Sequence, residues 1–241
     1  MIEFRVFFNK FFIYITLLFS CVACINSSQQ LVEDARVLMK ESKFREAIEL
    51  LNQAIAQHDE NAQAFNTRGV AYLELKDFAN AKLDFDQAAK LNPANYQPFF
   101  NRATLNGEQG NWEAALADIN EAARLSPDTA EVFIKRGMIE AATGQFEGAI
   151  ADFGRAISIN PKDKNAFYNR GSLYFQEEEV AKSIADFEQA IRLDSKFAKA
   201  FYALGMAYRQ QNKQEEGCLS LKQAQKLGYM DADAALKKYC K

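Results

Sequence analysis

Apolar and small residues recur along this chain at spacings of three and four positions, with polar residues between them. Around Phe65, Gly69 and Tyr72 this spacing places one apolar stripe along a helix. A short polar turn follows. A second stretch of the same kind then opens with Phe78 and ends before Pro93, whose ring cannot continue a helix. The pattern predicts pairs of amphipathic helices joined by short turns, and therefore an all-α chain.

This two-helix pattern repeats every 34 residues without a gap. A phenylalanine followed three positions later by an arginine marks the central copies, at Phe65, Phe99, Phe133 and Phe167. The spacing divides the chain into six units: 28–61, 62–95, 96–129, 130–163, 164–197 and 198–231. A period of this length indicates stacked repeats, in which each unit buries its apolar face against its neighbours.

The units carry an aromatic residue, a small residue, a tyrosine, an alanine, a second aromatic residue, a second alanine and a proline at fixed offsets. These positions resemble the signature of the tetratricopeptide repeat, and the resemblance covers residues 28–231. It implies a right-handed α-α superhelical solenoid of six helix pairs, with the first helices lining a concave groove. It also implies a scaffold that binds other proteins and has no catalytic role.

Several first-helix side chains are expected on or beside the concave groove. They are Phe100, Asn101, Ile134, Lys135, Tyr168, Asn169, Lys199 and Tyr202. Aromatic rings can anchor a partner and amide groups can bond to its main chain, so this groove suits an extended peptide or a partner helix. The alternative is an ordinary solvated surface.

In the four central units an arginine accompanies an aspartate 16 residues later. The pairs are Arg68 with Asp84, Arg102 with Asp118, Arg136 with Asp152, and Arg170 with Asp186. In the two outer units both positions change together. We predict an ion pair between the two helices of each central unit, contributing about 0.2–1 kcal/mol at a partly exposed site. The alternative is a shared ancestral duplication without any contact.

The third and fourth units lack the usual tyrosine of the first helix and carry Asn106 and Glu140 there. One interpretation is that both are tolerated polar residues at a half-exposed position. The other is that they form a polar spot for a ligand.

Residues 232–241 form an amphipathic segment after Asp231, which is expected to cap it as a short helix. A repeat array must cover its last apolar face, so this helix is expected to act as the C-terminal cap. Cys218 would lie beneath it. In an oxidising compartment we expect a disulfide bond between Cys218 and Cys240, the alternative being two buried free thiols.

The N-terminal residues differ in kind from the repeats. An uncharged apolar run, 11–20, follows Arg5 and Lys10, which is typical of a signal peptide and too short by itself to cross a bilayer. Residues 1–20 are therefore interpreted as a secretory or lipoprotein signal, and residues 21–27 as a polar tether.

The four residues that end at Cys21 resemble a bacterial lipobox, which implies that Cys21 is lipidated; Cys24 is the alternative. Plain cleavage near Ala23, giving a secreted protein, and an uncleaved N-terminal membrane anchor also remain open. The first interpretation predicts an envelope lipoprotein facing the periplasm or the cell surface.

Composition narrows the function further. The 241 residues include 25% charged and 49% hydrophobic residues, with a net charge of −3, and the basic residues are scattered. Such a chain is expected to be globular and not to bind nucleic acid. With one histidine and no nucleotide-binding or metal-ligand motif, we expect no enzyme activity, cofactor, metal or small-molecule substrate. The function predicted is an envelope-anchored scaffold for partner proteins; the alternative is a subunit that binds an envelope polymer or regulates an envelope enzyme.

Overall fold

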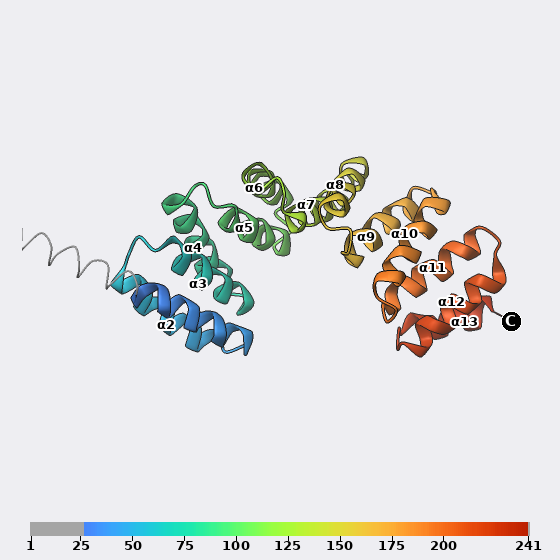
Figure 1. Cartoon of the computed structure of the whole chain (residues 1–241), viewed down its shortest axis with the longest axis horizontal. Helices are drawn as coiled ribbons and strands as arrows, with labels where there is room; N and C mark the ends of the chain where they lie inside the picture. Colours follow the sequence, from blue (N-terminus) through green and yellow to red (C-terminus); the bar gives the residue numbers. More distant parts are fainter. Residues whose placement is uncertain (1–26, 241) are drawn as a thin grey trace, which may run out of the picture. The chain divides into compact units, whose positions relative to one another are not determined.

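The computed structural model describes residues 27–240, and this part of the chain is entirely α-helical (Figure 1). The chain divides into two compact units. The first ends at Leu125, and the second begins at Ser126. Cys21, Cys24 and the predicted signal lie outside the described residues. None of the helices within 27–240 is long and apolar enough to span a membrane.

From residue 27 onward, the first unit contains six helices. They are 27–40, α2 (Phe44–Gln57), α3 (Ala62–Glu74), α4 (Phe78–Leu91), α5 (Tyr96–Glu108) and α6 (Trp112–Leu125). α3 packs most extensively against α4, and α5 against α6, while α4 also contacts α5. The helices therefore form stacked pairs.

The second unit continues the same order with α7 (Ala130–Ala142), α8 (Phe146–Ile159), α9 (Lys164–Gln176), α10 (Val180–Leu193), α11 (Ala198–Gln210), α12 (Gln214–Lys226) and α13 (Asp231–Tyr239). The main pairs are α7 with α8, α9 with α10, and α11 with α12. First helices begin every 34 residues, from α3 to α11. The predicted all-α array of tetratricopeptide helix pairs is confirmed.

Every turn between the two helices of a pair has one residue with left-handed backbone at the same position of the repeat. Glycine, which adopts this conformation at little cost, supplies it at Gly110 (φ 74°) and Gly144 (φ 78°). Four other residues supply it elsewhere, with φ between 59° and 61°: Ser42, Lys76, Glu178 and Asn212. The turn geometry is therefore imposed by the packing of the pair, because most side chains disfavour it.

The core of each pair depends on a close helix crossing. One position of the second helix is a fully buried alanine in all six repeats: Ala54, Ala88, Ala122, Ala156, Ala190 and Ala224. Opposite such a crossing, a Cβ atom added at Gly69 would lie 2.6 Å from the Phe85 ring. The small residues therefore let the large rings, such as Phe85 and Phe153, fill the space between the helices.

The last helix packs on α12 and buries Ala232 and Ala235. Its first residue is Asp231, and Met230 occupies the N-cap position without a side-chain bond. The prediction that Asp231 caps this helix is therefore wrong. Asp231 belongs to the first turn, where a carboxylate interacts favourably with the helix dipole. A disulfide bond joins Cys218 of α12 to Cys240, which follows α13.

Candidate functional site

Each predicted arginine–aspartate pair is brought together by two parallel hydrogen bonds between the helices of one pair. Nε and Nη2 of the arginine donate to the two carboxylate oxygens, at 2.8 and 2.7 Å for Arg68–Asp84, 2.9 and 2.5 Å for Arg102–Asp118, 2.6 and 2.7 Å for Arg136–Asp152, and 2.8 and 2.8 Å for Arg170–Asp186. The four aspartates are only 4–8% exposed, so the expectation of a partly exposed site is wrong for the carboxylates. Each depends on its arginine to compensate a buried charge.

The arginine also reaches the preceding pair, a contact that the sequence analysis missed. Nη1 of Arg102 donates to Asp86 on α4 at 2.6 Å, and Nη1 of Arg68 donates to Asn52 on α2 at 2.6 Å. Both partners lie 16 residues before the arginine, so the repeat period contained the signal. At Arg170 the corresponding residue is Gly154, which has no side chain to offer.

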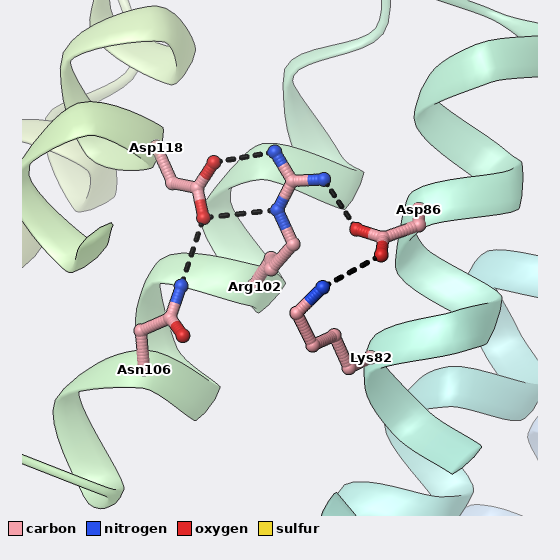
Figure 2. Close-up of polar contacts among 5 residues, drawn as sticks. All are labelled: Lys82, Asp86, Arg102, Asn106 and Asp118. Carbon is pink, nitrogen blue, oxygen red and sulfur yellow. Dashed lines mark hydrogen bonds and ion pairs between the residues drawn. The ribbon is translucent and has the colours of Figure 1, made fainter. Parts of the chain in front are cut away.

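Figure 2 shows the network around Arg102. Asn106 Nδ2 donates to Asp118 at 3.0 Å, and Lys82 Nζ donates to Asp86 at 2.8 Å. Hydrogen bonding to Asp118, and then to Asp86, raises the pKa of Arg102 above its ordinary value. Three successive helices, α4, α5 and α6, are thus joined through one guanidinium.

In the Arg68–Asp84 pair, burial shifts the pKa of the aspartate. Desolvation raises the pKa of the Asp84 carboxyl, and the hydrogen bonds from Arg68 oppose this shift. The pair thus links the two helices of the repeat through a buried carboxylate.

In the first unit, the predicted groove residues Phe100 and Asn101 on α5 are half-buried. Asn101 Nδ2 donates to Asn66 Oδ1 of α3 at 3.0 Å. The amide of Asn101 therefore links neighbouring first helices, in addition to any contact it could make with a partner.

In the second unit, Ile134, Lys135 and Asn169 are also half-buried. Ile134 packs against the core cluster of Ala149, Phe153 and Leu173. It therefore belongs partly to the interior of the α7–α8 pair.

Tyr168 and Tyr202, from α9 and α11, belong to an aromatic surface in the second unit. Tyr168 meets Phe197 edge to face with ring centroids 5.4 Å apart, and Tyr202 lies against Tyr229 at 4.8 Å. The Lys199 ammonium lies 4.4 Å from the centre of the Tyr168 ring. We call Tyr168, Phe197, Lys199, Tyr202 and Tyr229 the tyrosine–lysine face.

Lys199 supplies the positive charge of the tyrosine–lysine face, and it has no carboxylate partner among the described residues. Burial, and then the charge of Lys164, lowers the pKa of Lys199. Lys164 itself pairs with Asp194 at 2.5 Å. Aromatic rings around a partly desolvated cation can hold an apolar or aromatic side chain next to an acidic group. Within 27–240, no cluster of three or more histidine, cysteine or acidic residues is placed to hold a metal ion.

Models of repeat families match much of the chain. A model described as TPR repeat matches residues 137–177 and 171–212, and models described as tetratricopeptide repeat match residues 33–97 and 198–227. The sequence has no match among curated proteins.

Solved structures share the fold. The pilF protein of Pseudomonas aeruginosa is 14% identical with a TM-score of 0.80, over 90% of this chain and 99% of its own. PilW, described as a widely conserved type IV pilus biogenesis factor, is 19% identical with a TM-score of 0.74, over 82% and 92%. YrrB, described as a TPR protein with an unusual peptide-binding site, is 20% identical with a TM-score of 0.65, over 78% and 97%. At these identities the likeness concerns the fold.

Proposed function

Because the chain belongs to the tetratricopeptide repeat family, whose fold is generally a non-catalytic scaffold for protein interactions, we propose that it binds a partner protein at the tyrosine–lysine face. The observation that carries this proposal is the set of three tyrosines on α9, α11 and the turn before α13, with the Lys199 ammonium over the ring of Tyr168. Interface energy in proteins concentrates on such aromatic anchors.

The chemistry of this face suits a peptide segment or a partner helix with an apolar or aromatic anchor and a nearby acidic group. The rings of Tyr168 and Tyr202 supply apolar area at a low cost in side-chain entropy. Lys199 supplies a charge that the described residues leave unpaired. YrrB, which shares the fold, is described as having a peptide-binding site. This supports a peptide-like partner for the present chain.

The scaffold is proposed to be anchored in the cell envelope through its N-terminus. This part of the proposal rests on the apolar run 11–20 and on Cys21, or alternatively Cys24, as a lipidated residue. The disulfide bond between Cys218 and Cys240 agrees with an oxidising compartment. PilW, a structural neighbour, is described as a factor of pilus biogenesis, which also favours a place in the envelope for this chain.

Changing Tyr168→Ala and Tyr202→Ala together is expected to reduce the partner recovered from crosslinked cells at least tenfold, because aromatic hot spots typically contribute about 2 kcal/mol or more. Mass spectrometry of the affinity-purified full chain measures the recovery. Leu83→Ala with Leu219→Ala is the matched control: it removes two side chains that are 66% and 71% exposed, on the second helices α4 and α12.

Circular dichroism of both variants verifies that they remain folded. If the tyrosine variant and the native chain recover equal amounts of the partner, the binding site lies outside the tyrosine–lysine face. Retention of glycan without protein would favour the alternative function, an envelope polymer-binding subunit, because tyrosine rings also stack on sugars.

A further inference from the structure

Glu140, on α7, has a carboxylate oxygen that the fold encloses without satisfying it. Its Oε2 atom is buried and has no hydrogen-bond partner among the described residues. The same position of the repeat is occupied by tyrosine at Tyr72, Tyr174 and Tyr208, and by Asn106 in the preceding unit. A buried polar atom without a partner costs free energy, so this one requires a physical explanation.

The preceding repeat shows what the position is built to do. There, Asn106 Nδ2 donates to Asp118 Oδ2, while Arg102 occupies both oxygens of the same carboxylate. Asp152 is the counterpart of Asp118, and Arg136 holds it by two hydrogen bonds in the same way. The fourth repeat therefore presents the same acceptor but replaces the amide donor with Glu140. A carboxyl group can donate a hydrogen bond only when it carries a proton.

The facing helix leaves room for the Glu140 carboxyl. A Cβ atom added at Gly148 of α8 would lie 2.9 Å from Glu140 Oε2 and 3.1 Å from its Cδ. The five other repeats carry a side chain at this position, namely Glu46, Asn80, Ala114, Lys182 and Glu216. The unusual glutamate and the unusual glycine thus occur together, and the glycine lets the carboxyl lie between the helices.

The charged groups that act on Glu140 come from two helices. Asp152 lies on α8, and Arg136 lies one turn earlier on α7. The third helix that contacts this pair, α9, carries Arg170, which is paired with Asp186. Burial raises the pKa of Glu140, the charge of Asp152 raises it further, and Arg136 opposes these effects. Glu140, Asp152 and Arg136 all belong to the second unit.

We propose that the buried Glu140 carboxyl holds a proton that it donates to Asp152, so that the α7–α8 pair is a proton-sensitive element of the array. In the protonated form, the Glu140 hydroxyl donates to the Asp152 carboxylate and reproduces the Asn106–Asp118 hydrogen bond. When the proton leaves to water, two carboxylates face each other beside one guanidinium, and the contact between α7 and α8 is weakened.

The sign of the pH dependence follows from the raised pKa. The folded chain binds the proton more tightly than the unfolded chain, in which Glu140 has its ordinary pKa of 4.5. The stabilisation is complete below this value and is lost as the pH rises through the folded-state pKa. A folded-state pKa that is higher than the unfolded-state pKa by one pH unit lowers the folding equilibrium constant tenfold at neutral pH, relative to acidic pH.

A carbon-13 titration of glutamate carboxyl groups in the full native chain tests the proposal directly. The signal that disappears in Glu140→Gln identifies the residue. We expect its midpoint to lie above pH 4.5. A midpoint at or below 4.5 would show that the fold does not retain a proton on Glu140 and would overturn the proposal. The midpoint is measured on the native chain, and the Glu140→Gln variant serves only to assign the signal.

Urea unfolding between pH 4 and 8 supplies the second test. Glu140→Gln and Glu140→Asn, each with an amide donor for Asp152, should have higher unfolding midpoints than the native chain at pH 7, and the difference should shrink towards pH 4. Glu147→Gln, which neutralises an exposed carboxylate at the start of the same facing helix, should leave the pH profile nearly parallel to that of the native chain. A parallel profile for Glu140→Gln would contradict the proposal.

Discussion

Replacing Arg102 with methionine is expected to lower the free energy of unfolding by about 3 kcal/mol, near the lower end of the cost of breaking a buried ion pair. Methionine retains much of the apolar stem but leaves Asp118, which is 8% exposed, without its two strongest hydrogen bonds. Asp86 loses its bond from the arginine as well. The low end of the range applies because the Arg102 side chain is itself 22% exposed.

Urea unfolding followed by circular dichroism measures this change. Arg124→Met is the matched control, because the Arg124 side chain is 67% exposed and its pair with Glu121 lies within one helix, so its loss should change the stability far less. The double variant Arg102→Met with Asp118→Leu should recover part of the loss, since no buried carboxylate then remains unpaired. Equal stability of Arg102→Met and Arg124→Met would show that the network contributes little.

Removing the disulfide bond by Cys218→Ser with Cys240→Ser is expected to cost about 3 kcal/mol, the typical value for closing a loop of this length. The sequence separation is 22 residues, and the loop contains the turn into α13. Without the bond, α13 is held by the packing of Ala232 and Ala235 and by contacts of Tyr239 with Arg209 and Gln214. We therefore expect α13 to detach before the rest of the second unit unfolds.

Hydrogen exchange, read by mass spectrometry over residues 229–240, measures this detachment. Exchange there should accelerate in the double serine variant, whereas exchange in α7 and α8 should stay unchanged. The native chain treated with reductant serves as the comparison, because it opens the same bond without a substitution. Unchanged exchange in α13 after either treatment would contradict the prediction.

The 34-residue period predicted the helix pairs because it records the packing that every pair must repeat. The position of Ala122 is alanine in each unit since the backbones approach closely there, and Pro93, Pro127 and Pro161 mark the ends of three of the four central second helices. The arginine–aspartate contact could be predicted for the same reason. Both residues belong to one unit, and they change together in the outer units.

The contacts between pairs could not be predicted so directly. The Arg102–Asp86 bond depends on how one pair lies against the preceding one, and a pattern within single units does not record this. One of the two interpretations placed Asn106 at a half-exposed position. The side chain is instead buried, and it donates a hydrogen bond to Asp118. Tyr202 and Tyr229 both belong to the last unit, but Tyr229 occupies the position that is proline at Pro93, Pro127 and Pro161, so the other units do not predict this aromatic contact.

Gly154 has a consequence for the cooperativity of unfolding. In a linear array, each repeat is coupled to the next by a nearest-neighbour term, and unfolding proceeds together only where that term is large. Arg68 and Arg102 contribute to the term by bonding to the preceding pair, but Arg170 meets a glycine at the equivalent place. The junction between α8 and α9 therefore lacks this contribution to the coupling between one pair and the next.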